Sequence, residues 1–378
     1  LSTGHVPGPL PKHFTPDFLL DGVSSRYVAN YLRGAGSASA ILVVPPRTPF
    51  FANASSPRAV VDFRYTNPLG RTEPNAQYNT AIVSLGVRIG EHNAGAVGFR
   101  LRGAQGSGLE DVRVDFAGGY APDAGLAGVV GACGSGGAHH GVTVTGGRFG
   151  LDLRMSQPAS TISSVRLANQ SCGAVRYRGF ETLTAVGVEV SGLRGRVAVH
   201  ASGSPLPHLP DSDPCYLPDM PDDAQPTNTL IAGLMSFVDS AIHFAADVTP
   251  ASRVAFATNR SLFLQNVFVQ GAGVLAALSG SHVVVPPART ASSWTRVVAF
   301  ACGENPAPYP GHPEWQLVAP TWIGGTRYPP GGATLSRIQA SPDGPPADLA
   351  GARHHWAEDT FPTALSPGSL HVRAPPFN

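Results

Sequence analysis

Residues that could carry chemistry gather first in the stretch GACGSGGAHHGVTVTGGRFG at positions 131–150. Glycine surrounds two adjacent histidines, His139 and His140, which is compatible with a phosphate-cradling loop, a metal site or a tight turn between strands. No helix pattern follows the glycines, so the helix N-terminus that supports a phosphate loop is absent. Adjacent residues of an extended chain point to opposite faces, so the two histidines do not easily share one ion. The stretch is therefore interpreted as a turn, and no metal or cofactor is predicted.

Carboxylates offer a second kind of chemistry, because glycoside hydrolysis needs two of them roughly 5 to 10 Å apart. The acidic residues considered for such a pair are Asp111, Asp115, Asp152, Glu181 and Glu189. Asp115 and Glu189 are expected on the outer surface, at roughly 15 Å from each other if three coils separate them. Asp152 is expected to form an exposed pair with Arg154. No catalytic residue is assigned from these patterns.

Four cysteines contain no CxxC pair, which argues against a zinc knuckle or a thioredoxin-like redox site. Two disulfides are the expected use of an even number of cysteines. Cys133 is predicted to pair with Cys172, because a separation of one to two coils can bring them close enough. Cys215 is predicted to pair with Cys302, which would tie a long loop to the C-terminal tail.

Three sequons for N-glycosylation accompany the cysteines, at Asn53, Asn169 and Asn259. Sequons and disulfides together predict an extracellular protein, secreted to a cell wall or cell surface.

The composition excludes several classes of partner. The formal net charge is +1 and only 13% of residues are charged, which supports neither a nucleic-acid footprint nor a polybasic membrane patch. No apolar run reaches the roughly 20 residues of a membrane span. The 44 glycines and 36 prolines among 378 residues predict many turns and few helices.

A repeat explains the elements that must position these residues. Short β-branched runs begin at Val87, Val112, Val142, Val165 and Val188, which are 25, 30, 23 and 23 residues apart. Each run reads as strand, glycine or polar turn, strand, with a period typical of a solenoid. The dipeptide Asn-Gly, which would mark the hairpins of an antiparallel sandwich, does not occur. We predict an all-β chain folded as one right-handed parallel β-helix, with the five valines in one interior column and Gly146 and Gly147 at a corner that needs positive φ.

The same pattern predicts the organisation of the chain. Residues 1–40 are interpreted as an N-terminal extension with the first coil, and residues 41–300 as the β-helix. Residues 203–227 hold seven prolines and five aspartates and are interpreted as a loop excursion within the solenoid. Residues 301–378 are interpreted as an irregular tail, rich in tryptophan and proline, that packs on the helix.

The runs GAVGFRLRGAQGSGLEDVRVDFAGG, GSGGAHHGVTVTGGRFGLDL and SLFLQNVFVQG, with a late tryptophan-rich segment, resemble a known family. The pattern is similar to the first of the two β-helices in the tandem β-helix exo-β-1,3-glucanases, glycoside hydrolase family 55, within the pectate-lyase-like superfamily. The chain departs from it by lacking a GDGVTDDT-like opening motif. The family's general acid belongs to the second β-helix, so the resemblance transfers no catalytic residue here.

Three residues are candidates for binding glycan, and only the first of them is implied by the resemblance. Gln105 matches an Ala-Gln pair of the family motif and is a candidate for a cleft, with turn capping as its alternative role. Trp315 and Trp322 are candidate sugar platforms, with covering of the solenoid as the alternative. We expect a polysaccharide-associated module, not catalytic by itself, whose partners are polysaccharide or other β-helix modules. The alternative is the N-terminal half of a β-1,3-glucan hydrolase whose acid lies outside this chain.

Overall fold

The structure, a computed structural model, describes the backbone of most of the chain. The described residues are 2–3, 31–63, 78–134, 136–153, 159–179, 182–201, 215, 234–247, 249–258, 261–278, 281–284, 293–302, 321–323, 326–328, 333–341, 343–347 and 349. Among them the fold is all-β, and the only helical turns are η1 (Pro49–Phe51) and η3 (Pro250–Ser252). No helix in this part of the chain has the length and apolar character that crossing a membrane requires.

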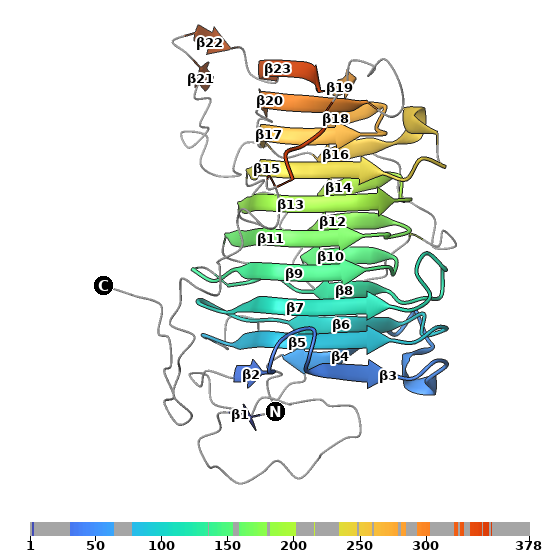
Figure 1. Cartoon of the computed structure of the whole chain (residues 1–378). Coiled ribbons are helices and arrows are strands. Elements are labelled where there is room, and N and C mark those ends of the chain that lie inside the picture. Colours follow the sequence, from blue (N-terminus) through green and yellow to red (C-terminus); the bar gives the residue numbers. More distant parts are fainter. Residues whose placement is uncertain are drawn as a thin grey trace, which may run out of the picture.

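A 12-stranded sheet, here the long sheet, runs along the whole solenoid (Figure 1). Successive strands of this sheet come from successive coils and pair in parallel. Its parallel strands are β2 (Tyr31–Arg33), β3 (Ile41–Val44), β5 (Ala81–Ile89), β7 (Gly108–Phe116), β9 (His139–Thr145), β11 (Ser160–Ala168), β13 (Leu183–Leu193), β15 (Met235–Phe244) and β17 (Leu262–Gln270).

A nine-stranded sheet, here the short sheet, forms the other wall. Its parallel strands are β4 (Arg58–Phe63), β6 (Ala96–Leu101), β8 (Ala127–Val130), β10 (Phe149–Leu153), β12 (Gly173–Tyr177), β14 (Val197–Ala201), β16 (Val254–Thr258) and β18 (Val274–Leu278). The chain alternates between the two sheets and advances by one strand in each. The predicted parallel β-helix is therefore confirmed.

The pairing changes at the C-terminal end. β19 (Ser281–Val284), β20 (Trp294–Cys302) and β23 (Ala333–Ser341) all pair antiparallel with their neighbours. The tail also contributes the strand pair β21 (Thr321–Ile323) and β22 (Thr326–Tyr328). β23 extends the long sheet, so this part of the tail is regular where we expected irregular chain. β1 (Ser2–Thr3) pairs antiparallel with β2 at the other end.

The interior is filled by columns of apolar side chains from equivalent positions of successive coils. Val112, Val142, Val165 and Val188 stack as predicted, and each is at most 2% exposed. The prediction for Val87 is wrong, because this residue stacks on Val114 and Leu85 takes the expected place. The remaining contacts of this core join both sheets into one cluster.

A bend in the long strands sets this register. Seven strands have a residue with positive φ at one aligned position, which repeats from coil to coil. These residues form the bend column: Ser84, Asp111, Gly141, Ser164, Gly187, Asp239 and Asn266. The bend lies three residues before Val87 but only one before Val112, which explains why matching the two valines by sequence alone fails. Glycine, asparagine and aspartate suit this conformation best.

Glycine also lets neighbouring coils stack closely in the glycine-rich stretch at residues 131–150. A Cβ on Gly134 or Gly137 would overlap the carbonyl oxygen of Ala104 or Ser107 in the coil before. Gly146 and Gly147 have φ of 78° and 76°, which confirms the predicted corner. The glycines are therefore explained by coil stacking and turning, and strand β9 follows them where a phosphate loop would need a helix.

The outer face of the short sheet differs from that of the long sheet, because it carries a buried apolar cluster. Its members are Ala59, Val97, Leu126, Ala127, Val130, Phe149 and Cys172. Cys215, from the proline-rich excursion, packs against this cluster. β15 takes the next place after β13 in the long sheet, in parallel register.

Candidate functional site

The outer face of the long sheet carries polar side chains at equivalent positions of neighbouring coils. Glu110 on β7, His140 on β9 and Ser163 on β11 align in one such column. Ser163 Oγ lies 2.8 Å from His140 Nδ1, within hydrogen-bond distance. We call this column and the one beyond the bend the outer ladder.

The second column of the outer ladder lies two residues beyond the bend. Its members in four successive coils are Arg113, Thr143, Arg166 and Glu189. Arg166 Nε lies 3.4 Å from Glu189 Oε2, and both side chains are nearly half exposed. The ladder therefore offers donors and acceptors from several adjacent coils on one solvent-facing surface.

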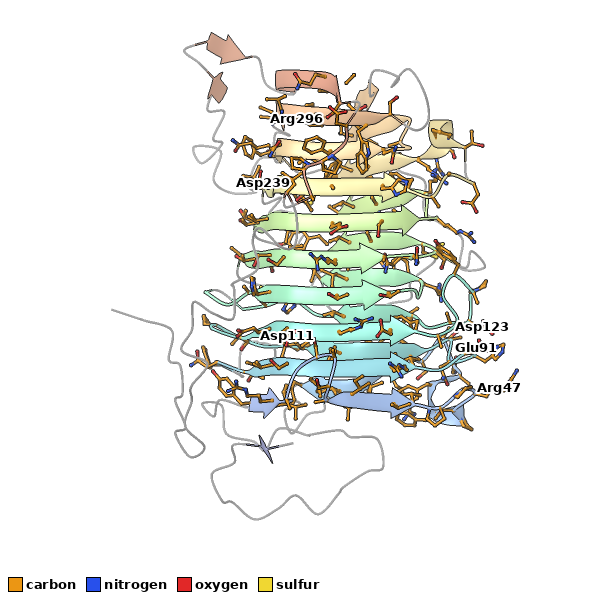
Figure 2. All side chains as sticks on the ribbon, viewed as in Figure 1. Arg47, Glu91, Asp111, Asp123, Asp239 and Arg296 are labelled. Carbon is orange, nitrogen blue, oxygen red and sulfur yellow. A yellow bond between two sulfur atoms is a disulfide. The ribbon has the colours of Figure 1, made fainter. Side chains whose placement is uncertain are left out.

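The two carboxylates of the bend column, Asp111 and Asp239, hold structural contacts (Figure 2). Asp111 accepts a hydrogen bond of 2.6 Å from Ser37 Oγ. Asp239 Oδ1 accepts one of 2.7 Å from Asn266 Nδ2, and Asn266 Oδ1 accepts one of 3.0 Å from Arg296 Nε. These acids fix neighbouring coils to one another.

The other candidate acids do not form a hydrolytic pair. Asp115 lies 2.7 Å from Arg113 Nε on the outer surface, as expected. It belongs to β7 and Glu189 to β13, so three strand spacings, about 14 Å, separate their strands. That separation exceeds the distance at which two carboxylates act on one glycosidic bond.

Asp152 requires a correction, and Glu181 lies outside the described residues. Asp152 is completely buried, on the outer side of β10 and in register with Val130 and Arg176. The expected exposed pair with Arg154 is therefore wrong for Asp152, and Arg154 itself lies outside the described residues. Strand alternation identified the correct side of β10 but could not show that this side is covered.

The two histidines point to opposite faces of β9, as predicted. His139 is completely buried, and its Nε2 donates a 3.1 Å hydrogen bond to the Gly131 carbonyl. Burial lowers the pKa of His139 to about 4. His140 faces outward. Within the described ranges, no group of three or more His, Cys, Asp or Glu side chains is placed to hold a metal ion.

Both predicted cysteine pairings are wrong. Cys172 is bonded to Cys215, with a Cα–Cα distance of 5.2 Å. Cys133 is a buried free thiol, and burial raises its pKa. Cys133 follows a strand of the short sheet whereas Cys172 precedes one, so they lie at opposite ends of that sheet. Cys302 lies in β20.

The predicted binding residues are not brought into one described site. Gln105 is exposed in the turn between β6 and β7, where its backbone carbonyl accepts a 2.8 Å hydrogen bond from Asn79 N. Trp322 lies in β21. Trp315 lies outside the described residues, so its proximity to Gln105 stays a prediction.

Two of the three sequons fall on described residues, and Asn259 lies outside them. Asn53 is exposed, and its Oδ1 accepts a 2.9 Å hydrogen bond from Ser55 N. Asn169 is half-buried with φ of 64°, and its Oδ1 accepts a 2.7 Å hydrogen bond from the Tyr120 hydroxyl. Asn53 is thus the more accessible acceptor.

Sequence reasoning missed the edge where the long sheet turns into the short sheet. Near the N-terminal end, Arg47, Glu91 and Asp123 project from this edge (Figure 2). His92 Nδ1 lies 2.5 Å from Asp123 Oδ2. Only the pairing of coils reveals this contact, because the two residues are 31 positions apart in loops without a shared motif.

Further along the same edge, Arg194 is the centre of a second network. Its guanidinium stacks 3.7 Å from the centroid of the Tyr120 ring, and its Nη2 lies 3.0 Å from Asp247 Oδ2. The three residues come from three different turns between the sheets. An arginine beside a strand was the only sequence signal for this network.

Comparison with known proteins gives no family for this chain: no protein-family model matches it, and neither does any curated protein.

Proposed function

We propose that this chain is an extracellular polysaccharide-associated β-helix module that does not hydrolyse glycan by itself. The outer ladder carries the proposal. It presents arginine, histidine, hydroxyl and carboxylate groups at the strand spacing of about 4.8 Å over several coils. Polar groups at a regular spacing suit a polymer with a regular repeat.

The positions and contacts of the acidic side chains support the proposal that the chain does not hydrolyse glycan. Within the described residues Asp115 and Glu189 are too far apart, and Asp111 and Asp239 are bound to neighbouring coils. The tandem β-helix glucanases remain the family that the sequence resembles. A β-1,3-glucan is accordingly the first glycan to test.

Secretion is supported by the disulfide and by one sequon. A Cys172–Cys215 bond persists in oxidising compartments and is rare in the cytosol. Asn53 is exposed on a turn, as a glycan acceptor must be.

Binding is tested by isothermal titration of the chain with soluble β-1,3-glucan oligomers and with other neutral cell-wall oligosaccharides. The double variant His140→Ala/Arg166→Ala removes two ladder groups and should weaken binding about thirtyfold, since each hydrogen bond contributes on the order of 1 kcal/mol. Arg58→Ala is the matched control, because Arg58 is an exposed arginine at the start of β4 in the short sheet. Gln105→Ala and Trp322→Ala test the two other proposed contacts.

Two results would overturn the proposal. One is a parent protein that binds none of the oligosaccharides, or binds one equally well in the double variant. The other is release of reducing sugar by the purified chain, which would favour the alternative of a glycoside hydrolase.

A further inference from the structure

Arg253 is a buried arginine whose hydrogen bonds are incomplete. It follows η3 at the edge between the sheets and is 1% exposed. Its Nη1 donates a 2.5 Å hydrogen bond to the Ala245 carbonyl. Nε and Nη2 are also buried, and neither meets an acceptor in the described part of the chain. A buried cation with unmet donors is costly, and an anion would satisfy it.

Two further arginines and one carboxylate, Asp247, lie around Arg253, and the charge of Asp247 acts on Arg253 as well as on Arg194. Arg196 lies one coil away, since its carbonyl accepts a 2.9 Å hydrogen bond from Val254 N, and its side chain is exposed. Arg194 lies two residues before it on the same turn and is paired with Asp247. The described part of this corner therefore holds three arginines and one carboxylate.

The remaining titratable neighbour of Arg253 adds no negative charge. His243 is partly buried, and burial followed by the charge of Arg253 lowers its pKa. It is therefore neutral near pH 7. In the next coil, Gly271 faces Arg253 without a side chain, and even a Cβ there would stand 3.6 Å from Nη1.

We propose that the corner formed by Arg194, Arg196 and Arg253 binds an oxyanion, the carboxylate or sulfate ester of an acidic polysaccharide. A guanidinium presents its donors in a planar fork that matches such groups in a bidentate manner. Arg253 is the buried anchor, Arg196 the exposed contact, and Arg194 is held in place by Tyr120 and Asp247. The identity of the ligand as a polysaccharide rests on the proposed function, whereas the anion site rests on this corner.

The test compares three probes of similar length by isothermal titration: a galacturonate oligomer, a sulfated glucan oligomer and a neutral glucan oligomer. Binding of either acidic probe is expected, and added salt should weaken it. Binding of the first, the second or both identifies carboxylate, sulfate or either as the group recognised. Arg196→Gln should weaken this binding about tenfold, because it removes a charge-assisted contact.

Arg253→Met tests the anchor, and it should reduce binding at least as much as Arg196→Gln. Thermal unfolding of Arg253→Met is measured as well. Replacing a buried charge with an apolar side chain is expected to keep or raise Tm. Arg58→Gln is the matched control and should bind like the parent.

The proposal is overturned if neither acidic probe binds the parent. It is also overturned if Arg196→Gln and Arg253→Met both bind the acidic probe as tightly as the parent does. Neutral glucan binding without acidic binding would remove the corner site and leave the proposed function. Acidic binding lost in the corner variants but unchanged in His140→Ala/Arg166→Ala would support the corner independently of the outer ladder.

Discussion

The two faces of the long sheet obey different constraints, and His139 and His140 show this on adjacent residues. Interior columns are mostly apolar from coil to coil, and the polar exceptions include His139 and Ser240, each of which forms hydrogen bonds. The outer column at the position of His140 changes in every coil, from Glu110 to His140 to Ser163. Stacking dictates the interior, whereas exposure to solvent leaves the residue types of the exterior free to differ.

The largest expected effect is a loss of stability caused by a charge placed in the interior. Val165→Asp places a carboxylate among Val142 and Val188, where no partner is available and water is excluded. We expect a loss of more than about 5 kcal/mol in the free energy of unfolding, enough to prevent folding. The neighbouring outward residue provides the control, since Arg166→Ala should cost about 1 kcal/mol or less.

Urea unfolding followed by far-UV circular dichroism measures both variants. If Val165→Asp unfolds at the same urea concentration as Arg166→Ala, the two faces are not distinguished as we describe.

The second effect concerns the outer face of the short sheet, which carries a buried apolar cluster. Cys172→Ser with Cys215→Ser opens a loop closed over 43 residues, which corresponds to about 4 kcal/mol in the chain-entropy description. Non-reducing peptide mapping should recover the Cys172–Cys215 peptide from the parent. Cys133 should react with a thiol reagent only after unfolding, because it is buried and its pKa is raised.

A disulfide-free parent, or one with Cys133 linked to Cys172, would contradict this assignment. Equal stability of the parent and the double variant would instead show that the bond contributes nothing to the fold.

The fold was predictable from sequence because its period is local. Alternating valines and glycine-rich turns repeat at 23 to 30 residues, and a parallel β-helix is the arrangement that stacks them. Register was not fully predictable, because it follows the bend column, and Ser84 carries no signal that distinguishes it from other serines. The predicted stacking of Val87 was wrong for that reason.

Site prediction failed where contacts depend on which end of a strand a residue occupies. Cys133 and Cys172 lie in nearby coils, but one follows a strand of the short sheet and the other precedes one, so they lie at opposite ends of the strands. Arg253 looks like an ordinary exposed arginine in sequence, since neither its burial nor its neighbours in other turns are encoded nearby.

The third effect sharpens the comparison between the two histidines. His139 has a pKa of about 4 in the folded protein and 6.5 in a model peptide, so the unfolded chain binds a proton that the folded chain does not. The free energy of unfolding therefore keeps its full value above about pH 6.5. It falls as the pH is lowered toward 4, by about 3 kcal/mol in total.

Urea midpoints at several pH values between 4 and 7.5 measure this loss. His139→Gln should flatten the pH dependence in this window, and the outward variant His140→Gln is the control that should leave it. An unchanged slope in His139→Gln would show that another group titrates.

The smallest effect is expected at the bend, where the two faces meet. Gly187 has φ of 66°, so Gly187→Ala places a side chain in the left-handed region and should cost about 1 kcal/mol. Ser164 occupies the equivalent place one coil earlier with φ of 52°, and its buried hydroxyl meets no hydrogen-bond partner among the described residues. Ser164→Gly relieves both the backbone strain and the unmet hydroxyl, so it should stabilise the protein by about 1 kcal/mol even after the entropic cost of glycine. Thermal unfolding of the two single variants should shift Tm in opposite directions. Shifts of the same sign would show that side-chain packing, and not the left-handed backbone, decides which residue the bend accepts.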